Sequence, residues 1–165
     1  MPNSSNTHLS PDGCALAIAQ SSIDANLAGD NGVATGDALP AGATILMVDD
    51  EKLNSYVVAQ YLKAAGYRAL VQTTDPLETL SLAARLRPDA ILLDIEMPRM
   101  NGLEVLRRIG ADPTLATIPV VIISAADDED VEAQARKLGA SGFLHKPILK
   151  DDLLALLQSI LARPN

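Results

Sequence analysis

Short apolar runs alternate with amphipathic segments from Thr44 onward, and this alternation constrains the fold more than any other feature. The apolar runs predict strands at 44–49, 67–72, 90–94, 119–123 and 142–145. The segments that follow them predict helices at about 52–65, 75–86, 101–110, 128–139 and 149–162. Strands that alternate with helices form a parallel sheet covered on both faces. The sequence therefore predicts an α/β domain over residues 44–165.

Right-handed crossovers leave few arrangements for such a parallel sheet. We expect a doubly wound five-stranded sheet in the order 2-1-3-4-5, the flavodoxin-like (βα)5 fold. In this order a crevice opens between the first and third strands at the carboxyl edge of the sheet. Polar residues at the ends of the strands should therefore gather there.

Polar residues end or follow four of the predicted strands: Asp49 and Asp50, Asp94, Ser124, and Lys146. We expect Asp94, which closes an apolar run, to be exposed above the sheet. Taken singly, each residue also has a structural explanation, because an aspartate can cap a helix and the others can be ordinary loop residues. Their shared placement at strand ends favours a common site.

Three carboxylates in one crevice repel one another, so the cluster makes sense with a positive counter-charge. Asp49, Asp50 and Asp94 offer only hard oxygen ligands, which favour Mg²⁺ over zinc or copper. Lys146 supplies a second cation. Such a site suits transfer of a phosphoryl group to a carboxylate, with the cations neutralising the phosphoryl oxygens.

Residues 44–162 resemble the receiver domain of response regulators in two-component signalling. The resemblance is carried by the order and spacing of Asp49-Asp50, Asp94 with Met97-Pro98 and Gly102, Ser124-Ala125, and Lys146-Pro147. It implies that Asp94 accepts a phosphoryl group from a phosphohistidine. It also implies that Asp50, Asp94 and the backbone carbonyl of Glu96 bind Mg²⁺ or Mn²⁺, with Asp49 supporting the ion through water.

The resemblance further implies how the phosphorylated state is read. Lys146 would pair with Asp94 before transfer and with a phosphoryl oxygen afterwards, and Ser124 would bond another phosphoryl oxygen. Phe143 matches the switch aromatic of the family. The fourth helix, fifth strand and fifth helix would form the output face, and the Lys146–Pro147 bond would be cis.

Two other classes of protein share parts of this pattern. An aspartate-nucleophile phosphatase of the haloacid-dehalogenase type also uses a strand-end Asp, echoed by Asp94-Ile95-Glu96, but here the paired acids precede the nucleophile. A flavodoxin-like electron carrier shares the sheet order, yet it should offer a hydroxyl-rich phosphate loop and flanking aromatics. This chain has one Phe, three Tyr and no Trp.

Residues 1–43 differ in composition from the rest of the chain. They contain no Lys or Arg and four acids, among many Gly, Ala, Ser and Asn residues, so we expect a low-complexity, mobile extension. The formal net charge of −8 disfavours direct nucleic-acid binding. The one cysteine, Cys14, fits a reducing compartment, and no apolar run is long enough to span a membrane, so we expect a cytoplasmic protein.

Two helices carry apolar patterns that bear on partners. Leu53, Val57, Tyr61 and Ala64 mark the predicted core stripe of the first helix. The fifth has six large aliphatic residues, so either it is well buried or Leu154 or Leu161 belongs to a docking surface.

The chain reaches Asn165 soon after the fifth helix, so we expect a single-domain response regulator that turns over no external substrate. A phosphorelay intermediate that passes the phosphoryl group onward is the alternative. Expected partners are a histidine kinase or phosphotransfer protein, a downstream protein, and a second copy in a phosphorylation-dependent dimer.

Overall fold

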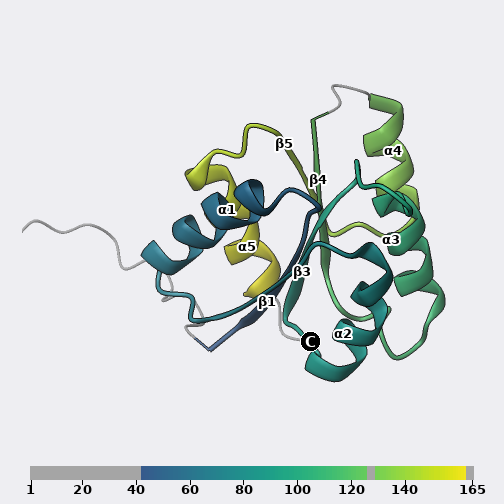
Figure 1. Cartoon of the computed structure of the whole chain (residues 1–165), viewed down its shortest axis with the longest axis horizontal. Helices are drawn as coiled ribbons and strands as arrows, with labels where there is room; N and C mark the ends of the chain where they lie inside the picture. Colours follow the sequence, from purple (N-terminus) through teal and green to yellow (C-terminus); the bar gives the residue numbers. More distant parts are fainter. Residues whose placement is uncertain (1–41, 126–128, 163–165) are drawn as a thin grey trace, which may run out of the picture. The chain divides into compact units, whose positions relative to one another are not determined.

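A computed structural model describes residues 42–125 and 129–162 of this chain (Figure 1). The expected mobile extension lies outside the described residues, apart from Gly42 and Ala43. The strands are β1 Thr44–Val48, β2 Ala69–Thr73, β3 Ala90–Asp94, β4 Val120–Ser124 and β5 Gly142–His145. The helices are α1 Lys52–Ala64, α2 Thr79–Leu86, α3 Gly102–Ala111, α4 Glu129–Lys137 and α5 Lys150–Leu161, with a 3-10 turn η1 at Pro76–Glu78 before α2.

The five strands form one parallel sheet in the order β2-β1-β3-β4-β5, which confirms the predicted fold class. Helices α1 and α5 cover one face, and α2, α3 and α4 cover the other (Figure 1). Alternate residues of each central strand enter opposite cores. In β1, for example, Ile45 and Met47 pack toward α1 and α5, whereas Leu46 and Val48 pack toward the other helices. This burial on both faces explains why the strands read as continuous apolar runs.

The predicted core stripe of α1 is wrong except at Tyr61, which is partly buried against the core on the α1 and α5 side. Leu53 is 72% exposed and Val57 is 38% exposed, whereas Ser55, Val58, Ala59 and Leu62 are buried. Both sets have helical spacing and both contain apolar residues, so periodicity alone could not choose between them. The packing of α1 beside α5 on the sheet decides which face is buried, and it leaves an exposed apolar surface at the start of α1.

Helix α5 is a core helix. Leu153, Leu157 and Ile160 are buried, and the partly buried Leu154 and Leu161 pack against the same core. The arrangement supports the first explanation for its wide apolar surface, burial, rather than a docking site at Leu154 or Leu161. None of the helices in the described ranges has the length and hydrophobicity that a bilayer span requires.

A buried phenol leads to a stability prediction. Tyr67 is fully buried before β2, and its hydroxyl has no hydrogen-bond partner within residues 42–125 and 129–162. An unpaired buried polar group costs about 1–3 kcal/mol. We therefore expect Tyr67→Phe to raise the free energy of unfolding by about 1 kcal/mol at neutral pH.

The same variant should respond differently to alkali. Burial raises the pKa of Tyr67 above its ordinary value of 10.0, so the wild type loses stability as the pH rises from about 10 through the folded-state pKa. Phenylalanine has no such loss, and the gap between the two proteins should widen in alkaline urea titrations. A variant less stable than the wild type at neutral pH would show that the hydroxyl makes a stabilising bond.

Candidate functional site

The strand order brings the predicted polar residues to one edge of the sheet. Asp49 and Asp50 directly follow β1, Asp94 ends the neighbouring β3, and Ser124 ends β4. Lys146 follows β5, and its backbone amide donates to the Ser124 carbonyl at 2.8 Å. Residues from four distant parts of the sequence therefore meet at the carboxyl edge, as the doubly wound order predicts.

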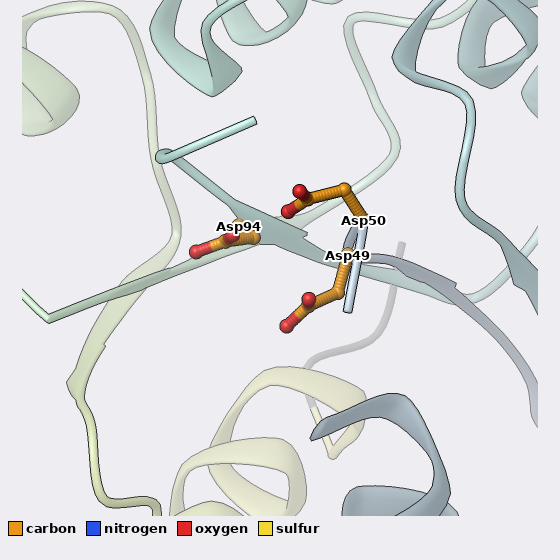
Figure 2. Close-up of side chains that lie close together, drawn as sticks. All are labelled: Asp49, Asp50 and Asp94. Carbon is orange, nitrogen blue, oxygen red and sulfur yellow. The ribbon is translucent and has the colours of Figure 1, made fainter. Parts of the chain in front are cut away.

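The three aspartates form a compact group. One carboxylate oxygen from each of Asp49, Asp50 and Asp94 lies within 4.8 Å of the others. Figure 2 shows the three side chains at the adjoining ends of β1 and β3, with their carboxyl groups turned toward the same side. Asp50, Asp94, Glu96 and Lys146 also line an open cavity of about 240 Å³.

Asp94 is buried, contrary to the prediction that it would be exposed above the sheet. Only 1% of its surface is exposed, and Asp49 is 6% exposed. The β3 chain continues past Asp94, because the Ile95 amide donates to the Ile123 carbonyl at 3.1 Å. The start of α3 then folds back, and the Gly102 amide donates to the Ile95 carbonyl at 3.0 Å. The acid therefore lies inside the sheet edge rather than above it.

Lys146 bridges two of the carboxylates. Its Nζ lies 3.0 Å from Asp94 Oδ1 and 3.3 Å from Asp49 Oδ2. The Lys146–Pro147 bond is cis, as the family resemblance implied. The ammonium thus occupies the position that the sequence predicted for a fixed cation.

The charges of the site are only partly balanced. Burial raises the pKa of Asp94 and outweighs the hydrogen bond and attraction from Lys146, so the pKa is raised overall. Burial by itself lowers the pKa of Lys146, but the bonds and attraction to Asp94 and Asp49 outweigh it and raise that pKa. One ammonium therefore does not fully compensate the buried acid.

The donor set fits a hard divalent cation. Asp49, Asp50 and Asp94 contribute only carboxylate oxygens, the ligands that Mg²⁺ prefers, and the open cavity leaves room for the waters that Mg²⁺ keeps. Such an ion would also supply the positive charge that Asp94 still lacks beside Lys146. The acidic pocket is thus suited to Mg²⁺ or Mn²⁺, as the sequence predicted.

Asn54, in the first turn of α1, is a site residue that the sequence analysis missed. It lines the same cavity, and its side-chain Nδ2 is 3.4 Å from Asp49 Oδ1 and 3.1 Å from Glu51 Oε2. An Asn near a helix start is usually interpreted as a local capping residue, so little in the sequence pointed to a role in the site. The available hint was its position, four residues after Asp50 and in the first turn of the helix that follows the paired acids.

Ser124 and Phe143 occupy the expected elements. Ser124 is fully buried at the end of β4. Phe143 in β5 is partly buried against the core on the α2, α3 and α4 side, and its ring centroid lies 4.9 Å from that of His145. The proposed switch movement of Phe143 stays a prediction.

Comparison with known proteins identifies the family. The family model of the response regulator receiver domain matches residues 45–158. The response regulator PleD of Caulobacter vibrioides is 42% identical over 118 residues, which are 72% of this chain but 26% of PleD. The protein PilH of Pseudomonas aeruginosa is 32% identical over 120 residues, which are 73% of this chain and 98% of PilH. The chain thus spans about a quarter of PleD and nearly all of PilH.

Solved structures agree with this assignment. The chemotaxis protein CheY4 of Vibrio cholerae aligns with a TM-score of 0.67 and 29% identity, over 73% of this chain and 99% of that protein. The receiver domain of a Pseudomonas aeruginosa sensor histidine kinase aligns with a TM-score of 0.67 and 28% identity, over 74% of this chain and 99% of that domain. That domain was solved with a magnesium ion coordinated in its active-site cleft.

The extent of the family match removes the two other families considered, because it covers the sheet, the acidic pocket and Lys146 together. The three aspartates and the lysine that suggested the family lie together at one pocket. The chain belongs to the response regulator receiver domain family of two-component signalling.

Proposed function

We propose that this chain accepts a phosphoryl group on Asp94 from a phosphohistidine of a histidine kinase or phosphotransfer protein. The observation that carries the proposal is a buried carboxylate with an ammonium 3.0 Å away and two further carboxylates beside it. Such a group is shielded from bulk water, and the ammonium beside it, together with a bound Mg²⁺, would neutralise an incoming phosphoryl group.

The transfer step needs the phosphohistidine, Asp94 and one proton from the solvent. An oxygen of Asp94 attacks the phosphorus, the phosphorus–nitrogen bond breaks, and its electron pair stays on the imidazole, which takes up a proton. Bound Mg²⁺ would neutralise charge on the phosphoryl oxygens. Asp50, Asp94 and the backbone carbonyl of Glu96 would hold the ion, and Asp49 would orient one of its waters.

Two further residues would respond to the new group. Lys146 would move its ammonium from Asp94 Oδ1 to a phosphoryl oxygen, and the hydroxyl of Ser124 would donate to another. The change would reach the face formed by α4, β5 and α5 through Phe143, with a coupling free energy of about 1–3 kcal/mol. In this proposal the chain turns over no external substrate, and the lone Cys14 supports a cytoplasmic location.

The first test is incubation with acetyl phosphate, with and without Mg²⁺, followed by intact-mass measurement. We expect one added phosphoryl group per chain in the presence of Mg²⁺ and little after chelation. The modification should be lost in mild alkali, as an acyl phosphate is, whereas a phosphoserine would survive. Absence of any modified protein at saturating donor would refute the proposal.

The exposed apolar start of α1 is a surface on which a protein donor could dock. Leu53 and Tyr56 are 72% and 59% exposed, and they line a groove of about 600 Å³ with Gln72, Thr73 and Thr74. Helix α1 begins two residues after Asp50, so this surface adjoins the mouth of the acidic pocket. In this proposal, a partner that delivers a phosphoryl group to Asp94 contacts this surface.

Replacing both Leu53 and Tyr56 with Ser should therefore slow phosphorylation by a protein donor about tenfold or more, because a buried aromatic anchor is commonly worth over 1 kcal/mol. Phosphorylation by acetyl phosphate should be unchanged, since a small donor needs no docking surface. Gln60→Ser, one turn farther along the same helix, is the control. Equal slowing with both donors would indicate damage to the pocket instead.

A further inference from the structure

We propose that Asn54 is a positioning residue of the ion site, which acts by holding Asp49. The inference rests on the proposed function, because it concerns the Mg²⁺ that the acidic pocket would bind. Asn54 is the third residue of α1, and it lines the cavity that also holds Asp94 and Lys146. It is thus part of the pocket wall rather than of the outer surface of the helix.

The Asp49 carboxylate is held from both sides. Its Oδ1 accepts a hydrogen bond from the Glu51 amide at 2.8 Å and a longer one from Asn54 Nδ2 at 3.4 Å. Its Oδ2 faces Lys146 Nζ at 3.3 Å. Donors on both oxygens fix the plane of the carboxylate, which decides where its remaining lone pairs point. A buried carboxylate held in this way is ready to accept from a metal-bound water without further reorganisation.

Asn54 also separates two acids. The same Nδ2 donates to Glu51 Oε2 at 3.1 Å, so one amide group stands between the carboxylates of Asp49 and Glu51. Without these donors, both carboxylates would face the pocket with less compensation, and their mutual repulsion would act on the orientation of Asp49. Asn54 would thus keep Glu51 away from the ion and keep Asp49 directed at it.

A purely local role makes a different prediction. Glu51 and Asn54 also lie at the start of α1, where the backbone N–H of Asn54 donates to the backbone carbonyl of Glu51 at 3.1 Å. If the side chain served only to start the helix, its loss would lower thermal stability and leave the affinity for Mg²⁺ unchanged. The two roles can therefore be separated by measuring both quantities on the same variants.

The experiment measures the Mg²⁺ dissociation constant of the unphosphorylated protein by calorimetry, and the thermal midpoint without Mg²⁺. Asn54→Leu has a side chain of similar size but cannot donate to Asp49 and Glu51. It should weaken Mg²⁺ binding about tenfold, the order of effect seen when an outer-shell residue of a metal site is lost. Asn54→Gln, which retains the amide, should recover part of the loss. Gln60→Leu is the matched control, since it makes the same kind of change at an exposed position of α1 and should bind as the wild type does.

A double-mutant cycle with Asp49→Ala tests the route of the effect. If Asn54 acts through Asp49, Asn54→Leu should have less than a twofold effect in the Asp49→Ala background. A dissociation constant of Asn54→Leu within twofold of the wild type, or an undiminished effect in that background, would overturn the inference. If Asn54→Leu does not fold, Asn54→Ser takes its place in the same comparison. A wild type that binds no Mg²⁺ would instead contradict the proposed function.

Discussion

Asp94→Asn is expected to abolish phosphorylation and, in the absence of Mg²⁺, to make the folded protein more stable. The amide has the shape of the carboxylate but no nucleophilic oxygen charge, so acetyl phosphate should add no mass to the variant. Asp94 is 1% exposed, and the Lys146 ammonium lies 3.0 Å from its Oδ1. A neutral group of the same size therefore avoids the cost of burying a partly compensated charge.

The stability difference between the wild type and Asp94→Asn should depend on pH. The folded-state pKa of Asp94 is raised above its ordinary value of 3.8, mainly by burial. The folded state therefore favours the protonated form of Asp94. The stability that this form contributes is fully present below about pH 3.8 and is lost as the pH rises through the folded-state pKa. The urea midpoint of Asp94→Asn should match that of the wild type in acid and exceed it at neutral pH.

Mg²⁺ should reverse the order of the two proteins. A ligand that binds only the folded state stabilises it in proportion to the logarithm of its concentration over the dissociation constant, and the variant lacks one anionic ligand. Asp89→Asn is a suitable control, because Asp89 accepts a hydrogen bond from the Thr44 amide away from the pocket. Phosphorylation of Asp94→Asn at the wild-type level would show that another residue is the acceptor.

Gly102→Ala is expected to cause the largest loss of stability among the changes considered. A Cβ atom at Gly102 would lie 2.1 Å from the Asp94 carbonyl oxygen and 2.9 Å from Ile95 Cα. These are backbone atoms of the chain leaving β3, so no side-chain rotation can relieve the contact. We expect a loss of about 3 kcal/mol or more in the free energy of unfolding, because the start of α3 must move away from the sheet.

The same change should also impair the pocket. The backbone around Asp94 and Glu96 would shift, so phosphorylation should fall even under conditions where the variant remains folded. Gly110→Ala in the same helix is the matched control. Its Cβ would meet only the Leu138 carbonyl oxygen at 3.5 Å, an ordinary contact, and helix propensity favours alanine by up to about 1 kcal/mol. Urea denaturation of both variants checks the prediction, and equal midpoints would contradict it.

Element types and boundaries were largely predictable from local sequence. The predicted strand 90–94 and helix 101–110 differ by at most one residue at each end from β3 and α3. The predicted helix 75–86 instead divides into η1 and α2, with Asp75 accepting from the Leu77 amide and Pro76 starting the turn. The Asp75 cap and the fixed backbone angle of Pro76 favour a tight first turn at Pro76–Glu78. The spacing of apolar residues does not distinguish such a turn from an α-helix.

The residues of the site were predictable because parallel strands share one carboxyl edge. Once the strand order is assumed, Asp49, Asp94 and Lys146 must converge, and they do so within ion-pair distance. Their environment was not predictable. The sequence suggested an exposed Asp94, whereas the chain on either side of it continues the sheet and folds back over it.

By itself, the sequence determined the α/β class, the positions of the strands and the set of acids and cation at their ends, because these depend on local periodicity and on the geometry of parallel sheets. Only the tertiary structure decided which side of α1 is buried, how deeply Asp94 lies and that Asn54 reaches Asp49. These features depend on how helices pack across the sheet. Such packing is set by contacts between distant segments, which local spacing does not encode.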